Sequence, residues 1–145
     1  MRLTRITNET ELHAAFNIRI AVFVEEQGVA LEVELDEHDA YADHVLVYFD
    51  NQPVATGRVR IVNDTAKLER ICVMPSHRKY GIGKAVVQAL EEIAKEKGLR
   101  KAKLHGQTQA MPFYEKLGYI SASDEFMEEG IPHKLMIKDL ILNCV

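Results

Sequence analysis

Residues 68–84, with the sequence LERICVMPSHRKYGIGK, combine residue types and a spacing that could bind an anion. An apolar run ends at Pro75, a polar turn follows, and residues 82–97 carry the apolar pattern of an amphipathic helix. Gly81 and Gly83 remove side chains where the backbone must turn and where a ligand could come close. The first N–H groups of a helix lack helical partners and carry the positive end of its dipole, which favours phosphate. The cationic side chains around this turn are Arg78, Lys79 and Lys84.

The spacing excludes two familiar phosphate loops. A Walker loop has four residues between its glycines and a hydroxyl residue after its lysine, whereas here one residue separates Gly81 from Gly83, and Ala85 follows Lys84. A dinucleotide-binding fingerprint needs a third small residue, but Val86 stands at that position and the chain lacks repeated βαβ units. The pattern that remains is R-x-x-G-x-G between a strand and a helix.

Two motifs in this chain resemble those of the GNAT superfamily of acetyl-CoA-dependent N-acetyltransferases. The R-x-x-G-x-G pattern at residues 78–83 is similar to that family's pyrophosphate-binding loop. FYEKLGY at residues 113–119 is similar to its F-Y-x-x-x-G-[FY] segment. The resemblance extends over residues 2–140, and VFVEEQ at 22–27 and GIPH at 130–133 resemble small single-domain bacterial members.

The resemblance implies that acetyl-CoA is the co-substrate. In the family, the strand before the loop pairs with the pantetheine arm, the loop holds the diphosphate, and the N–H of Val73 would stabilise the oxyanion. Gln107 stands where many relatives have an asparagine that contacts the coenzyme arm. The residues expected to bind the coenzyme are Ile71, Cys72, Val73, Arg78, Lys79, Tyr80, Gly81, Ile82, Gly83, Lys84 and Gln107.

Tyr114 is the candidate general acid. Acetyl transfer to an amine requires a thioester beside a neutral amine, a donor for the oxyanion and routes for two protons. The resemblance places Tyr114 near the coenzyme sulfur, and a phenol with a reference pKa of about 10 can protonate a departing thiolate. Its alternative role is packing against the coenzyme arm. Because family members usually transfer the acetyl group directly, Cys72 is expected to be a small buried hydrophobe and not a nucleophile.

Glu69 is the candidate general base. It lies two residues before Ile71, at a place where some GNAT relatives carry an acid, and regular alternation puts it on the same strand face as Ile71 and Val73. The alternative is an ion pair with a neighbouring arginine. The candidate partners are Arg58, Arg60 and Arg70.

Three further side chains are candidates for contacting the acceptor. His105 and His133 carry imidazoles, which titrate near neutrality, so either could be a base, a substrate contact or a structural histidine. Glu26 belongs to the acidic stretch at residues 25–43, which is either a solvated surface or a rim that attracts a cationic amine. The six histidines show no ligand spacing and no C-x-x-C occurs, so no metal site is expected.

Composition restricts the remaining possibilities. The 145 residues predict one domain spanning 1–145, and the net charge of −4 disfavours nucleic-acid binding. No apolar run reaches the roughly 20 residues of a membrane span, and the first residues lack the apolar region of a secretory signal. Two cysteines, Cys72 and Cys144, give no disulfide framework. These features predict a cytoplasmic protein.

Periodicity predicts the order β-α-β-β-β-α-β-α-β-β. Strands are expected at 2–6, 44–49, 54–62, 66–74, 101–105, 119–126 and 133–142, with helices at 8–26, 82–97 and 109–117. Residues 29–42 are expected to be irregular, with a helical turn at most. This order predicts an α/β (α+β) fold with a mixed sheet flanked by helices. The resemblance adds that two central parallel strands splay apart at one end.

The favoured function is transfer of acetyl from acetyl-CoA to a primary amine of a small molecule, by direct attack in a ternary complex. One alternative is a non-catalytic domain that binds or senses acyl-CoA, and another is a protein acetyltransferase acting on lysines or N-termini. Neither nucleic acid nor a membrane is an expected partner. The protein is expected to be a monomer or a homodimer, and an exposed last strand at 135–142 could mediate the dimer.

Overall fold

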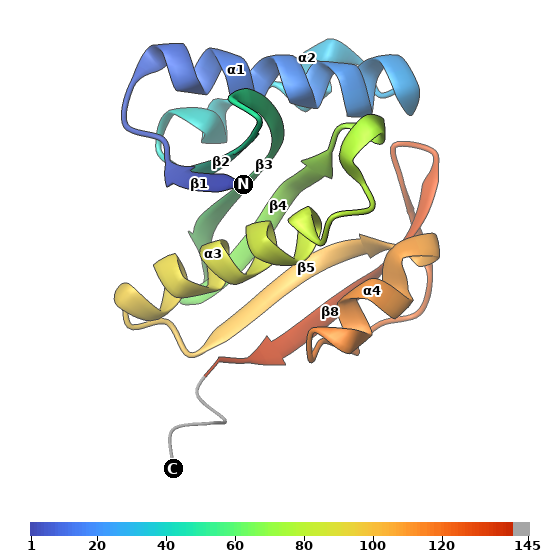
Figure 1. Cartoon of the computed structure of the whole chain (residues 1–145). Coiled ribbons are helices and arrows are strands. Elements are labelled where there is room, and N and C mark those ends of the chain that lie inside the picture. Colours follow the sequence, from blue (N-terminus) through green and yellow to red (C-terminus); the bar gives the residue numbers. More distant parts are fainter. Residues whose placement is uncertain (141–145) are drawn as a thin grey trace.

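The computed structural model describes residues 1–140 and contains an eight-stranded mixed sheet with helices on both faces (Figure 1). The strand order is β1-β2-β3-β4-β5-β8-β6, and β7 pairs with β8 beside β6. The strands are β1 (Arg2–Arg5), β2 (Asp43–Phe49), β3 (Gln52–Val62), β4 (Thr65–Val73), β5 (Lys101–Gln107), β6 (Ile120–Ser121), β7 (Phe126–Glu128) and β8 (Ile131–Asp139). The α-helices are α1 (Glu9–Arg19), α2 (Leu31–Glu34), α3 (Ile82–Glu96) and α4 (Met111–Lys116). The π-helix η1 (Ile20–Glu26) and the 3₁₀ segments η2 (Glu37–Ala40), η3 (Pro75–His77) and η4 (Thr108–Ala110) complete the fold.

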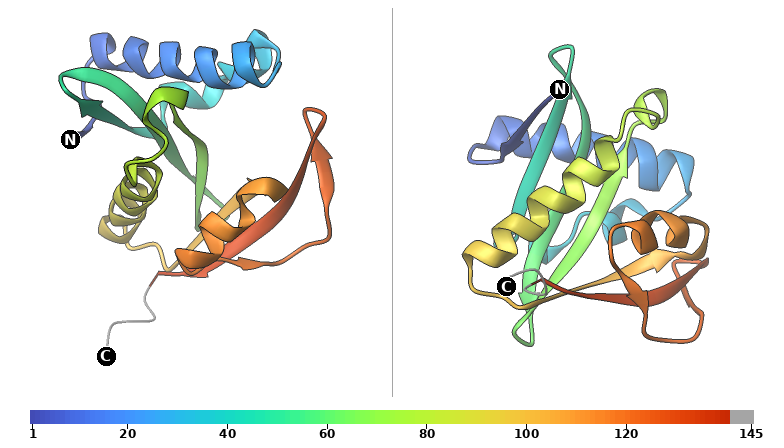
Figure 2. Two further views of the ribbon diagram at one scale, coloured as in Figure 1. Left: turned by 45° about the vertical axis from the view of Figure 1, so that its right-hand side comes forward. Right: turned by 60° about the horizontal axis from the view of Figure 1, so that its bottom comes forward.

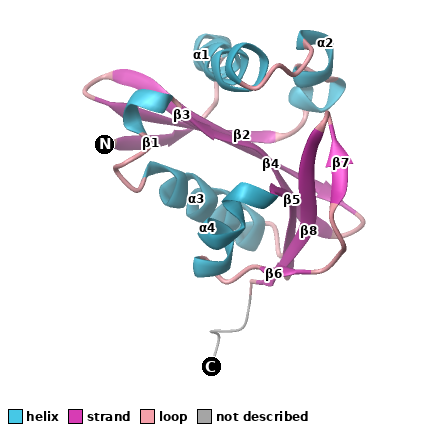
Figure 3. Ribbon diagram, turned by 90° about the vertical axis from the view of Figure 1, so that its right-hand side faces the viewer, coloured by secondary structure: helices cyan, strands magenta, loops and turns pink. Residues whose placement is uncertain are grey.

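Two apolar cores hold the helices against opposite faces of the sheet (Figure 3). The apolar face of α3, with Val86 and Leu90 fully buried, packs on one face together with α4. Ile18 of α1 and Val22 of η1 pack on the other face, against Leu46. Burial of each such aliphatic side chain is worth about 1.5–3 kcal/mol, so the two cores fix α1 and α3 relative to the strands between them. No helix within residues 1–140 is long and apolar enough to cross a membrane.

The parallel pair β4 and β5 separates soon after it forms. The two strands pair only at Ala66 with Ala102 and at Lys67 with Lys103. Beyond these positions they diverge, as the views in Figure 2 show, and the later residues of β4 have β3 as their only strand neighbour among residues 1–140. The splayed parallel pair expected from the sequence is therefore present.

A bulge in β4 reverses the alternation of its side chains. Glu69 pairs with Arg58 and Cys72 pairs with Thr56, so two residues of β4 lie opposite one residue of β3. Arg70, in the bulge, has a left-handed φ of 58°. As a result Leu68 belongs to the core under α3, whereas Cys72 belongs to the core under α1.

The elements agree with the predicted order except near the C-terminus. The expected strand at 119–126 is wrong: only the short β6 and β7 form, and both pair with β8. Glu129 and Gly130, with φ of 51° and 74°, make the tight turn between β7 and β8. Because residues 135–137 of β8 have β5 on one side and β6 and Ala122 on the other, they are not an exposed edge for dimerisation. The rest of the predicted strand, 141–142, lies outside the described residues.

Candidate active site

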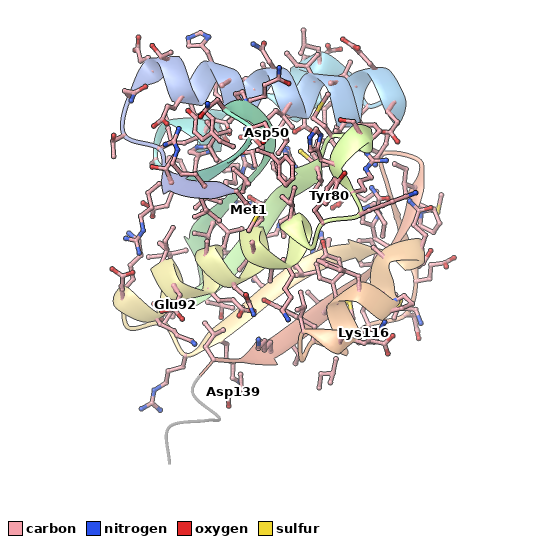
Figure 4. The ribbon with its side chains drawn as sticks, in the orientation of Figure 1. Met1, Asp50, Tyr80, Glu92, Lys116 and Asp139 are labelled. Carbon is pink, nitrogen blue, oxygen red and sulfur yellow. The ribbon has the colours of Figure 1, made fainter. Side chains whose placement is uncertain are left out.

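A cleft of about 840 Å³ opens where β4 and β5 separate. The start of α3 and the end of β4 form one wall, and β5, α4 and the β7–β8 hairpin form the other. Residues of η1, α2 and η2 line it on the α1 side of the sheet. Figure 4 labels Tyr80 on the turn before α3 and Lys116 at the end of α4.

The start of α3 has the glycine turn and the helix N-terminus that the predicted anion cradle requires. Gly81 caps the helix with a left-handed φ of 71° and no side-chain cap, and the space around its missing Cβ is open. The first N–H groups of α3 therefore remain available for an anion. The Ile82 side chain is buried in the core, so only its main chain could contribute to this site. Lys84 is exposed and lines the cleft.

Gly83 has a packing role that the sequence did not reveal. A Cβ at this position would lie 3.3 Å from Cζ of Phe113 and 3.9 Å from Cγ2 of Val73. The absent side chain thus lets the Phe113 ring of α4 pack against the start of α3. Gly83 connects the coenzyme loop to the helix that carries Tyr114.

Arg78 is held in place by two partners. Its guanidinium donates to both carboxylate oxygens of Glu26, at 2.8 and 2.7 Å, and its Nε donates to the carbonyl of Val73 at 3.0 Å. The carboxylate of Glu26, a candidate acceptor contact, therefore lies against the coenzyme loop. Arg78 lowers the pKa of Glu26, so that carboxyl stays ionised.

Lys79 and Tyr80 are expected coenzyme contacts that do not line the cleft. The Tyr80 ring packs 4.9 Å from the ring of Phe49 and 5.9 Å from that of His77. This aromatic contact holds Tyr80 on the outside of the turn, where it is exposed together with Lys79.

The main chain of Val73 faces the split. The Met74 N–H donates to the carbonyl of Val54 at 2.8 Å, so the neighbouring pair of Val73 and Ala55 is a non-hydrogen-bonded pair of the antiparallel ladder. In such a pair the N–H and C=O groups point away from the partner strand. The Val73 N–H therefore points to the side where β5 has moved away, as an oxyanion donor requires.

Tyr114 lies on the α3 side of the split, under the cleft. Its ring packs against Gly106, where a Cβ would be 3.2 Å from Cδ2 of the tyrosine. Burial raises the pKa of Tyr114 to about 12, so the phenol keeps its proton at neutral pH. Among residues 1–140 the hydroxyl has no hydrogen-bond partner, while Tyr114 lines the cleft. Burial also raises the pKa of the Cys72 thiol, which opposes a nucleophilic role for Cys72.

Glu69 is enclosed by cations. Arg60 donates to it at 2.7 Å, Arg58 at 3.1 Å, and the Lys67 ammonium lies 3.2 Å away. Although burial opposes it, these charges lower the pKa of Glu69 to about 2, which makes it a weak proton acceptor. The contacts favour the ion-pair interpretation, with Lys67 as a partner in place of Arg70.

Glu69 also lies on the opposite face from the one expected. Because of the bulge at Arg70, Ile71 and Val73 pack in the core under α3, whereas Glu69 and its partner Arg58 face the α1 side, where Arg58 contacts Asp39 at 2.7 Å.

A buried ion-pair network, missed at the sequence level, holds the acidic segment over the cleft. Arg19 donates to Glu34 at 3.0 Å and to Asp39 at 2.7 Å, and all three residues are buried. Arg58 extends the network to Asp36 at 2.7 Å. For the buried carboxylates of Glu34 and Asp39, both predictions made for the acidic stretch, a solvated surface and a rim that attracts an amine, are wrong. The sequence feature that could have revealed the network is a basic residue within an otherwise apolar stretch, as at Arg19 and Arg58.

The histidines lie on the β5–β8 wall, on the α1 side of the split. His105 Nδ1 lies 2.8 Å from Oε1 of Glu128, and His133 Nε2 lies 3.7 Å from Oε2 of the same carboxylate. His133 Nδ1 donates to the carbonyl of Ile131 at 2.7 Å. His105, Glu128 and His133 all line the cleft. Sequence reasoning selected both histidines but missed Glu128, whose place depends on the β7–β8 turn.

Gln107, on the same wall, is already hydrogen-bonded. Its amide nitrogen donates to Gln27 at 2.9 Å, and its oxygen accepts from Gln109 at 3.0 Å. The contact with Gln27 connects the end of β5 to the residue after η1. A coenzyme contact by Gln107 would have to share or replace these bonds.

Together, the split parallel strands, the helix start at Gly81 and the buried phenol of Tyr114 are the features expected of an acyltransferase. A profile of the acetyltransferase (GNAT) family matches residues 12–119. Two Bacillus subtilis proteins, YyaT and the N-acetyltransferase YjcF, are 58% and 44% identical to this chain, covering 99% and 96% of it and 99% and 100% of their own lengths. A candidate N-acetyltransferase from Lactobacillus plantarum has the same fold, with a TM-score of 0.88, 30% identity and coverage of 96% and 97% of the two chains. This chain belongs to the GNAT acetyltransferase family.

Proposed function

We propose that this protein transfers the acetyl group of acetyl-CoA to a primary amine of a small molecule, by direct attack in a ternary complex. The observation that carries the proposal is the split between β4 and β5, where the Val73 N–H has no strand partner among residues 1–140. The α3 side of the split would receive the coenzyme and is called the coenzyme face; the α1 side would receive the acceptor and is called the acceptor face. The glycine turn at 81–83 suits the diphosphate, and Arg78, Lys84 and the α3 N–H groups would hold it.

The residues present support each half of the reaction. As the amine attacks the thioester carbon, the Val73 N–H would donate to the developing oxyanion. When the carbon–sulfur bond breaks, the hydroxyl of Tyr114, which has no hydrogen-bond partner among residues 1–140, would give its proton to the sulfur. Cys72 has no part in this scheme, because its side chain packs in the core under α1.

The segment from η1 to α2, which lies over the acceptor face, supports a small acceptor. The η1–α2 segment lies over the α1 side of the cleft and is tied down by Gln27 to β5 and by Arg70 to the carbonyl of Glu34 at 3.2 Å. The β7–β8 hairpin borders the cleft opposite to it. Walls on both sides of the cleft support a small acceptor over a peptide, which requires an open groove.

The test combines binding and turnover. Calorimetry should show acetyl-CoA binding to the purified chain, and a colorimetric assay for free CoA should detect release with at least one amine of a panel of amino acids, amino sugars and polyamines. Binding without release would favour the sensing domain, and release with peptides alone would favour the protein acetyltransferase. Absence of acetyl-CoA binding would remove the proposal.

A further inference from the structure

The acceptor face needs a group that can take a proton from an ammonium substrate, and Glu69 is poorly suited to that role. Glu69 is bound by Arg58, Arg60 and Lys67, which stabilise its carboxylate and leave it little proton affinity. The neighbouring carboxylates Asp36 and Asp39 are likewise paired with arginines.

Burial raises the pKa of Glu34, which also lines the cleft, but Arg19 at 3.0 Å and Arg70 at 2.9 Å hold its carboxylate. His38, on η2, is bound through Nδ1 to the Tyr41 hydroxyl. A proton acceptor is therefore expected on the β5–β8 wall.

His105 and Glu128 form a dyad with the required geometry. A carboxylate only accepts hydrogen bonds, so the 2.8 Å contact to Oε1 of Glu128 places the proton of a neutral His105 on Nδ1. The other ring nitrogen, Nε2, then carries a lone pair. Nε2 makes no hydrogen bond with another residue in the described range 1–140, and the His105 side chain is 29% exposed in the cleft.

The strand register brings His105 of β5 and Glu128 of β7 together across β8. Gln107 of β5 and Phe126 of β7 both lie opposite His133 of β8, and alternation puts His105 and Glu128 on the same sheet face as these residues. The Phe126 ring packs edge-on to His105 at 5.0 Å and parallel to His133 at 6.1 Å. The ring holds the two imidazoles on either side of the Glu128 carboxylate.

The charged groups around the dyad keep Glu128 ionised. The contact with His105 lowers its pKa, with smaller contributions from His133 and from Lys67 on β4. Glu129, in the turn before β8, also lines the cleft. An anionic Glu128 orients the His105 ring and stabilises the imidazolium that forms when His105 takes a proton.

We infer that His105, through Nε2, is the general base that deprotonates the amine, and that Glu128 is its positioning residue, itself held by His133. This assignment rests on the proposed acetyltransferase function. The substrate ammonium gives one proton to Nε2, and the resulting amine attacks the thioester carbon. The carbon–nitrogen bond forms, the carbon–sulfur bond breaks, the sulfur takes the Tyr114 proton, and the second nitrogen proton restores the phenol. The products are the amide, free thiol and one proton, carried by His105 and then released to water.

The proposed acid, Tyr114, and the proposed base, His105, lie on opposite faces of the sheet. Tyr114 packs against Gly106 on the α3 side of β5. His105, the residue before Gly106, faces the α1 side. The acid and the base are therefore presented to the split from opposite faces of one strand. This matches a reaction in which the amine and the departing thiolate lie on opposite sides of the carbonyl carbon.

The experiment compares pH profiles of kcat/KM for the wild type, His105→Gln and Glu128→Gln, with His13→Gln on the exposed surface of α1 as the matched control. His105→Gln should lose about 100-fold or more at neutral pH, and its rate should then rise about tenfold per pH unit with the free-amine fraction. Glu128→Gln should move the acid limb to lower pH, because the imidazolium loses its anionic partner. His105→Ala should be partly rescued by added imidazole, and calorimetry should show unchanged acetyl-CoA binding in every variant.

The contrary outcomes are distinct. A His105→Gln profile equal to that of His13→Gln, or a loss of rate with unchanged profile shape and no rescue by imidazole, overturns the assignment while leaving the acetyltransferase intact. If the wild type releases no CoA with any amine, the proposed function fails and the assignment fails with it.

Discussion

Replacing Glu26, the acid that binds Arg78, should strengthen binding of acetyl-CoA. In the structure both terminal nitrogens of the Arg78 guanidinium are bound to Glu26, at 2.7 and 2.8 Å, and the side chains are 42% and 39% exposed. Exposed pairs of this kind are worth only about 0.2–1 kcal/mol. If a diphosphate has to displace this pair, Glu26→Gln should lower the Kd for acetyl-CoA by a factor of about 1.4 to 5.

The assay is titration calorimetry with acetyl-CoA at low and at high ionic strength. The neighbouring Glu25→Gln, also exposed, is the matched control and should behave as the wild type. The gain in Glu26→Gln should shrink as salt rises, because screening weakens both the pair and the repulsion between Glu26 and phosphate. Weaker binding by Glu26→Gln, with Glu25→Gln unchanged, would refute the reasoning and show that Glu26 holds Arg78 in its binding position.

Three further predictions test the site and its support. Tyr114→Phe should lower turnover by about 100-fold or more with unchanged acetyl-CoA affinity, and equal turnover in stopped assays would remove the acid role. Gly81→Ala should lower the urea-derived stability by about 1–2 kcal/mol, because a Cβ is strained at a φ of 71°; unaltered stability would contradict this. The pKa of Glu69 is about 2 in the fold against an ordinary 4.5, so its stabilisation is complete above pH 4.5 and lost toward pH 2. Glu69→Gln should therefore flatten the pH dependence of stability in that window.

Local sequence rules predicted most of the fold. The cap at Asn8, whose side chain accepts from the N–H of Glu11 at 2.8 Å, and the apolar face of α3 follow from composition and period alone. The two-residue turns at residues 50–51 and 63–64 have φ values of 51–63°, as Asn and Asp residues tolerate. The strand at 119–126 failed because β6 and β7 are stabilised by pairing with β8, which sequence patterns do not reveal.

The parts of the candidate site that are formed by the main chain could be predicted from the sequence. The cradle depends on glycine spacing and a helix start, both visible in the sequence. The sequence indicated Arg60 as a candidate partner of Glu69, but the bulge at Arg70 decides which sheet face Glu69 occupies. The role of Glu128 depends on His105, which it meets across β8 from a strand much earlier in the chain. Alternation along one strand could reveal neither the bulge nor this contact.

The bulge at Arg70 connects the architecture to the chemistry. A non-glycine residue in a left-handed conformation costs about 1–3 kcal/mol, and it persists only where surrounding contacts fix it. Here the Arg70 side chain donates to the carbonyls of Val33 and Glu34 and to the Asp36 carboxylate, all within 3.1–3.3 Å. These bonds tie the segment over the acceptor face to the point where β4 reverses its alternation. The same residue thus turns Glu69 toward the α1 side and Ile71 and Val73 toward the α3 side, so that a single strand contributes to both faces that the proposed reaction would use.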